Sequence, residues 1–214
     1  MRHAQRHAQI RTSERRRRLA VEAARLISEH GIRDYRQAKL KAAERLGIHD
    51  DASLPRNREI EDALREHQRL FLGDAHAQLL RERREVAVQA LEFFSGFDPR
   101  LVGAVLEGTA DEHSAVCLHL FDDDPESVVR YLAERGIPYD QQKRRLRLDA
   151  ERADDFPVLL FAVEGAPIDL TVLPRDALRQ APLDRIDERP MRRASLSAVR
   201  QMLLEEDLAQ HEGT

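Results

Sequence analysis

The chain has 214 residues, of which 42% are hydrophobic and 35% charged, a composition that can fold around a buried core. No stretch approaches the roughly 18 consecutive apolar residues of a membrane span, and the Arg- and His-rich N-terminus lacks the apolar segment of a secretion signal. We therefore expect a cytoplasmic protein without membrane association. Its single cysteine, Cys117, excludes an intrachain disulfide and any multi-cysteine metal site.

The net charge of −4 is unevenly distributed. Residues 1–50 carry 13 Lys and Arg against 6 Asp and Glu, whereas the rest of the chain carries 22 against 33. Such a basic arm, with four consecutive arginines at 15–18, fits a contact with nucleic acid or an acidic partner, because arginine and lysine neutralise phosphates. The run also fits a solvated helix end, which is the more common role of clustered charge.

The first half of the chain is predicted to be helical throughout. Apolar residues recur at helical spacing over 13–30 and 35–46, a third helix begins after Pro55, and a helical stretch continues to Phe94 with a break at Gly73. Pairs of short helices also occur in helix-turn-helix DNA-binding domains. No turn signature selects a recognition helix here, so simple packing is the default interpretation.

The composition changes at residues 95–99, beyond which short apolar strands alternate with turns. We therefore place a domain boundary between residues 1–95 and 96–214. The expected fold is α+β: an all-helical N-terminal region, then a small domain with a mixed sheet and flanking helices. The predicted strands are 101–106, 115–121, 144–148, 158–164 and 168–173, with helices from Pro125 to Gly136 and from Ser195 onward.

One segment carries the functional argument. Residues 103–118 read Gly-Ala-Val-Leu-Glu-Gly-Thr-Ala-Asp-Glu-His-Ser-Ala-Val-Cys-Leu. The segment resembles the nucleotidyltransferase superfamily, the fold shared with DNA polymerase beta and the small bacterial and archaeal nucleotidyltransferases. That family has Gly-Ser, three residues, Gly, a short turn and then Ser-Asp-x-Asp on the next strand, and Gly103, Gly108 and Ser114 match this spacing. The resemblance covers residues 101–173 and implies a polymerase-beta-like domain.

The departures from the family motif fall on the residues that perform the chemistry. Ala104 stands where the family has a serine, and Ala115 and Cys117 stand where it has two aspartates. In the family those aspartates lie two apart on a strand, point to one face and hold two magnesium ions. Magnesium requires oxygen ligands, which neither a methyl group nor a soft thiol supplies. The resemblance thus implies a pseudoenzyme with no cofactor, and Mg²⁺ is expected only if the chain is an active enzyme.

Asp169 is the one candidate catalytic residue left in place. The third carboxylate of the family usually lies on a neighbouring strand, and alternation along 168–173 puts Asp169 and Thr171 on the face opposite the core. An exposed carboxylate, or one paired with Arg145 or Arg147, is the alternative interpretation.

The strand 144–148 adds two candidate phosphate ligands. Leu146 and Leu148 are predicted to pack inward, with Arg145 and Arg147 on the open face, where the family meets nucleotide or nucleic acid. Both arginines are suited to bind phosphate by charge and hydrogen bonds. Charged side chains also protect exposed sheet edges from pairing, and the sequence does not separate these two roles.

Two further groups near the motif are candidate replacements for the lost metal ligands. Three carboxylates follow the strand 115–121, namely Asp122, Asp123 and Asp124, but a helix cap by Asp124 explains them better. His119 is predicted on the same strand face as Cys117, so that with Asp169 it would complete a Cys-His-carboxylate cluster. A half-buried histidine beside a small buried thiol is the favoured interpretation.

The sequence therefore predicts a catalytically degenerate nucleotidyltransferase-fold protein that binds a nucleotide, a nucleic acid or a protein partner. One alternative is an active metal-dependent nucleotidyltransferase, which transfers a nucleoside monophosphate from a nucleoside triphosphate to a hydroxyl, with Asp169 assisted by Asp122, Asp123 or a substrate-bound metal. The other is a regulatory scaffold that binds a protein partner through its N-terminal helices.

Overall fold

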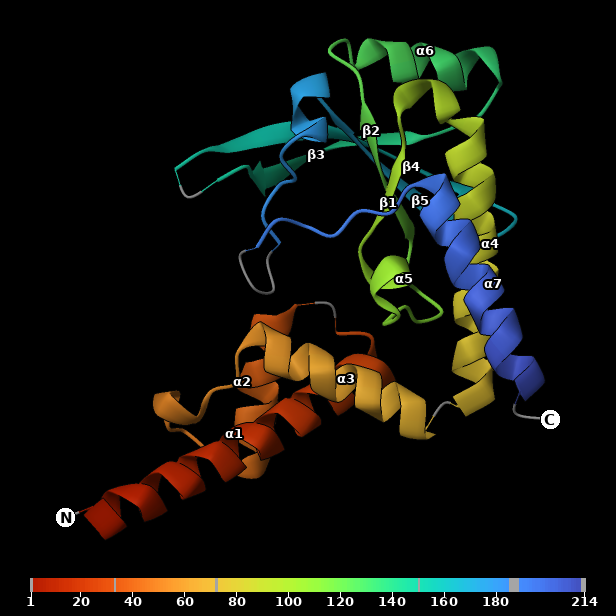
Figure 1. Cartoon of the computed structure of the whole chain (residues 1–214). Coiled ribbons are helices and arrows are strands. Elements are labelled where there is room, and N and C mark those ends of the chain that lie inside the picture. The colour runs from red at the N-terminus through yellow and green to blue at the C-terminus, as the bar shows by residue number, and fades with distance from the viewer. Residues whose placement is uncertain (1, 33, 72, 150, 185–188, 213–214) are drawn as a thin grey trace. The chain divides into compact units, whose positions relative to one another are not determined.

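A computed structural model describes residues 2–32, 34–71, 73–149, 151–184 and 189–212. The chain forms two compact units, Met1–His76 and Ala77–Thr214 (Figure 1). This division lies before the composition change at residues 95–99, because the preceding helix shares its core with the sheet and not with the N-terminal helices. No helix in the described ranges is long and apolar enough to cross a lipid bilayer.

The first unit is built from helices, as predicted. Its elements are α1 (Arg2–His30), α2 (Tyr35–Leu46), the 3-10 turn η1 (Asp51–Ser53) and α3 (Asn57–Phe71). Small residues at the contacts, such as Ala23, Ala24 and Ala38, are fully buried and allow the helices to approach closely. The side chain of Asp34 caps α2 by accepting from the backbone N–H of Gln37.

The second unit contains a five-stranded mixed sheet within its described residues. Its elements in chain order are α4 (Gly73–Phe93), η2 (Ser95–Phe97), β1 (Arg100–Val102), α5 (Ala104–Glu107), β2 (Val116–Phe121), α6 (Glu126–Glu134), β3 (Asp140–Arg147), β4 (Ala153–Val163), β5 (Ala166–Leu173), η3 (Arg175–Leu178) and α7 (Leu196–Glu212). The strand order is β1-β2-β5-β4-β3, with β2 and β5 parallel and the other neighbours antiparallel. The predicted α+β fold is confirmed.

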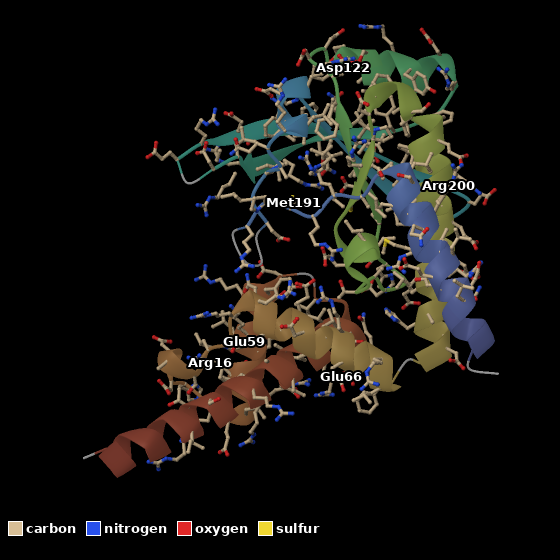
Figure 2. The ribbon with its side chains drawn as sticks, viewed as in Figure 1. Arg16, Glu59, Glu66, Asp122, Met191 and Arg200 are labelled. Atoms are coloured by element: carbon tan, nitrogen blue, oxygen red, sulfur yellow. The ribbon has the colours of Figure 1, made fainter. Side chains whose placement is uncertain are left out.

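Three helices bury one face of this sheet. Leu91 of α4, Leu132 of α6 and Val199 of α7 pack in one core with Leu118 of β2 and Leu170 of β5. Helix α7 lies beside α4 (Figure 1). The two helices are joined by ion pairs between Arg81 and Asp207, between Arg84 and Glu206, and between Arg200 and Glu92. Arg200 is labelled in Figure 2. These three helices cover only one of the two faces of the sheet.

The predicted strand over 101–106 is wrong in its second half. Strand β1 ends at Val102, and α5, a single helical turn, follows from Ala104. Gly103, which precedes the turn, has φ 73° and ψ −156°, a conformation that is essentially restricted to glycine and interrupts a strand. Gly108 then ends α5 in the left-handed conformation. The apolar residues at 105–106 therefore reach the core from a helical turn, a placement that short apolar runs do not distinguish from a strand.

Candidate functional site

The parallel pairing of β2 with β5 places the motif positions side by side. Cys117 is in register with Asp169, and His119 is in register with Thr171. Residues in register on neighbouring strands point to the same face, so these four side chains share the face opposite the helices. Ile168 lies in the helix-covered core instead. The predicted alternation along β5 is therefore confirmed, and Cys117 and Asp169 lie side by side on one face.

Gly103, the first glycine of the motif, approaches Cys117, whereas Gly108 lies against Leu80 and Arg84 of α4. A Cβ atom added to Gly103 would lie 3.7 Å from Cys117 Cβ and 3.8 Å from Cys117 Sγ. The backbone of the turn thus approaches the strand position at which the family has an aspartate. Ala104 is the first residue of α5, and Ala115 directly precedes β2.

Ser114 has a role within the turn between α5 and β2. Its hydroxyl accepts a hydrogen bond from the backbone N–H of Asp111 at 2.9 Å and donates one to Asp111 Oδ1 at 2.7 Å. Asp111 Oδ1 also accepts from the backbone N–H of His113 at 3.0 Å. These bonds shape the loop by the side-chain-to-backbone pattern typical of Asx turns.

Asp169 forms a bidentate ion pair with Arg144 of β3. Arg144 Nη1 lies 2.9 Å from Asp169 Oδ1, and Arg144 Nη2 lies 2.6 Å from Asp169 Oδ2. Arg144 Nη1 also donates to Thr171 Oγ1 at 3.1 Å. The hydrogen bonds that Arg144 donates to Asp169 raise the pKa of the Arg144 guanidinium against the opposing effect of burial. Both carboxylate oxygens of Asp169, the predicted catalytic residue, are thus occupied by an internal cation.

Arg145 and Arg147, the predicted phosphate ligands, lie on the other face of the sheet. Arg144 is in register with Phe156 of β4, and Asp169 is in register with Leu160 of the same strand. Phe156 and Leu160 are four residues apart and therefore point to the same face. Arg144 thus shares the face of Asp169, whereas its neighbours in β3 point to the other face. Arg145 is exposed and 3.7 Å from Asp155, and Arg147 is exposed as well. The predicted placement of both arginines on the open face is wrong.

The reason for this error is that the sheet buries apolar side chains on both faces. Leu146 packs with Phe121, Phe156 and Leu173 in a second, smaller cluster beneath η3. That cluster lies on the same face as Asp169, since Leu173 is four residues along β5 from it. The burial of Leu146 was correctly predicted, but it does not point to the helix-covered core. A period-2 pattern identifies two faces without stating which face holds the site.

His119 is buried between charged groups. Its side chain is 3% exposed, and its Nδ1 atom has no hydrogen-bond partner among the described residues. Burial lowers the pKa of His119 to about 3, and the positive charges of Arg193 and Arg144 add to the effect. The imidazole is therefore neutral at physiological pH. In the described part of the chain, no three His, Cys, Asp or Glu side chains are arranged to hold a metal ion.

Two arginines that the sequence did not single out complete this face. The backbone of Ala194 forms an antiparallel bridge with Leu101 of β1, so Arg193 and Arg100 occupy diagonal positions on either side of that bridge. Both side chains point to the face of His119, because Arg100 is in register with His119. Arg193 donates to the carbonyl oxygens of Ala177 at 2.8 Å and Leu178 at 3.0 Å. Its guanidinium lies 5.4 Å from the ring centroid of Phe121. Arg193 enters from the connection after η3, a segment without any recognisable motif.

The three aspartates after β2 stabilise the following loop and helix. Asp122, labelled in Figure 2, accepts from the backbone N–H of Asp124 at 2.9 Å, and Asp123 accepts from the backbone N–H of Arg175 at 2.9 Å. Asp124 accepts from the backbone N–H of Glu126 at 3.2 Å and pairs with Arg130 at 2.8 Å. These bonds explain all three side chains as stabilisers of the loop and the start of α6, although the N-cap residue is Pro125 and not Asp124 as predicted.

Comparison with protein-family models, with curated proteins and with solved structures finds no match. The nucleotidyltransferase resemblance accordingly rests on the residues of this chain and on their spacing.

Proposed function

We propose that this protein is a catalytically degenerate relative of the nucleotidyltransferases that binds a nucleotide on the Asp169 face of its sheet without a metal ion. The observation that carries the proposal is the bidentate pair between Arg144 and Asp169. In a two-metal transferase this carboxylate would be a metal ligand. Here a guanidinium occupies both of its oxygens.

The remaining motif positions support the same conclusion. Ala115 has no donor atom for a metal, and Cys117 offers sulfur, which is a poor ligand for magnesium. A magnesium ion would have to displace Arg144 and then bind to a single carboxylate. Arg144 neutralises Asp169, and Arg100 and Arg193 add positive charge to this face. Arginine binds phosphate oxygens well, because its planar donors match their geometry.

The test is the thermal stability of the full chain with nucleoside triphosphates, in Mg²⁺ or Mn²⁺ and in EDTA. A ligand that binds only the folded state raises the melting temperature. We expect the same rise in EDTA as in Mg²⁺, and no transfer of a nucleoside monophosphate to a hydroxyl. A rise that requires the metal, together with transfer that is lost in Asp169→Asn, would establish the active transferase instead. No rise with any nucleotide would contradict nucleotide binding.

A second candidate function, binding of a protein partner, is favoured by a groove in the helical unit. The groove has a volume of about 560 Å³ between α1 and α3. It contains three markedly exposed apolar side chains, Val21, Leu70 and Phe71, which are 50%, 58% and 73% exposed. Exposed apolar patches of this kind are typical of interaction surfaces. If the groove binds a protein, Phe71→Asp should abolish binding to a partner that the wild-type chain retains in purified form, while Arg145→Gln should not.

A further inference from the structure

Two guanidinium groups on the Asp169 face have no acidic counterpart. Neither Arg100 nor Arg193 forms an ion pair with a carboxylate in the described ranges, whereas Arg144 of the same sheet face is neutralised by Asp169. Their hydrogen bonds go to main-chain carbonyl oxygens, those of Asp98 and Pro99 for Arg100 and of Ala177 and Leu178 for Arg193. The face therefore carries two uncompensated positive charges.

Arg100 and Arg193 occupy neighbouring backbone positions, and both side chains are partly removed from water. The pairing of Leu101 with Ala194 puts Arg100 and Arg193 at diagonal positions, whose backbones in an antiparallel pair are about 7 to 8 Å apart. Arg193 is partly buried above the ring of Phe121. Burial lowers the pKa of the Arg193 guanidinium, and the charge of Arg100 lowers it further. Like charges held together in a partly desolvated position repel, and an anion placed between them would remove that repulsion.

Both side chains retain donors for such an anion. A guanidinium has five N–H donors, and the Nε and Nη2 groups of Arg100 and the Nε group of Arg193 have no partner among the described residues. His119 lies across from Arg100 in the register of β1 with β2, and its buried Nδ1 is also unsatisfied. Four polar groups on one face thus lack a partner, and three of them belong to cations. The arrangement fits an oxyanion with several acceptor oxygens better than a single carboxylate.

We infer that Arg100 and Arg193 form a metal-independent binding site for a phosphate or pyrophosphate group. The inference rests on the proposed function and specifies it, because it assigns the phosphate contacts of a bound nucleotide to these two residues and not to Arg145 or Arg147. Arg144 holds Asp169 and orients that side chain. The same chemistry also describes a free phosphate or pyrophosphate ion, so the experiment must separate the two sources.

The experiment measures the affinity of the full chain for inorganic phosphate, for pyrophosphate and for ATP by titration calorimetry, in EDTA and at constant ionic strength. The test variants are Arg100→Gln and Arg193→Gln, and the matched control is Arg145→Gln, which removes an equally charged residue from the opposite face of the sheet. We expect pyrophosphate binding to weaken at least tenfold in each test variant and by less than twofold in the control. An Arg100→Lys variant, which keeps the charge but loses the forked donor geometry, should lie between these limits.

Each result of the titrations supports or overturns the anion site at Arg100 and Arg193. Unchanged binding of pyrophosphate by Arg100→Gln, or equal losses in Arg100→Gln and Arg145→Gln, would overturn the site. Arg100→Gln carries the test even if Arg193→Gln fails to fold, because the hydrogen bonds of Arg100 are local to residues 98–99. If ATP binds with the same affinity in both test variants, the site is wrong and nucleotide binding stands. If pyrophosphate binds through the two arginines but ATP does not, the anion site stands and the proposed nucleotide function fails.

Discussion

Replacement of Arg144 by methionine should destabilise the protein, because it leaves the Asp169 carboxylate uncompensated. The side chain of Asp169 is 11% exposed, and that of Arg144 is 35% exposed. Removing one partner of a fully buried ion pair costs about 3 to 5 kcal/mol, most of it the cost of the charge left behind. Water that reaches the Arg144 side will relieve part of that cost, so we expect a loss of about 2 to 3 kcal/mol.

The assay is the free energy of unfolding from urea titration, with Arg145→Met as the matched control. Arg145 is 68% exposed and 3.7 Å from Asp155, so its loss should cost less than about 0.5 kcal/mol. The double variant Arg144→Met with Asp169→Leu removes the stranded charge and should be more stable than Arg144→Met alone by at least about 1 kcal/mol. If Arg144→Met is as stable as the control, or if the double variant is less stable than Arg144→Met, the ion pair does not have the role assigned to it.

Three other predictions follow from the same structure. The folded-state pKa of His119 is about 3, so its imidazole stays neutral in the folded protein, whereas in the unfolded chain it takes up a proton below pH 6.5. The free energy of unfolding therefore falls on acidification, by about 2 kcal/mol between pH 7.5 and 5. His119→Phe should lack this part of the pH dependence in urea titrations, and an equal slope in both proteins would contradict the burial of a neutral imidazole. Gly103→Ala should lower the free energy of unfolding by about 1 to 3 kcal/mol, because alanine is strained in the backbone conformation of Gly103. Gly96→Ala should lower it far less, because a Cβ added there meets nothing within 4 Å. Equal melting temperatures of the two variants would refute this prediction. Arg84→Ala should loosen α7 from α4 and lower the free energy of unfolding by about 3 kcal/mol, because Arg84 is 6% exposed and pairs with Glu206 of α7. Arg200→Ala, at the exposed end of the same helix contact, should lower it by less than about 0.5 kcal/mol. Limited proteolysis of α7 that is equally fast in both variants would count against the difference.

Short-range patterns in the sequence were sufficient for most elements of the fold. Helix α2 occupies the predicted residues 35–46, because Asp34 caps its start and Gly47 ends it in a left-handed conformation. Alternation along β5 correctly put Asp169 on the face opposite the helix-covered core. These features depend on neighbouring residues in the chain, and the composition and spacing of those residues can be read directly.

The surroundings of Asp169 depended on contacts that no local pattern contains. Arg144, and not Arg145 or Arg147, reaches the carboxylate because two strand registers, β3 with β4 and β4 with β5, together set the face of each residue. A shift of one residue in either register would exchange the arginines. Arg193 arrives from a connection more than 70 residues after β2, and its place is decided by the pairing of Ala194 with Leu101.

Sequence alone therefore determined most of the helices and sheet-forming segments, and it suggested a resemblance to the nucleotidyltransferases that stays a prediction. Only the tertiary structure decided which charges meet on the Asp169 face and which part of the chain belongs to each compact unit. The physical reason is that hydrophobic periodicity assigns a residue to a buried or exposed side of its own element. Pairing between distant elements then determines which side chains meet, and it is set by the packing of the whole unit.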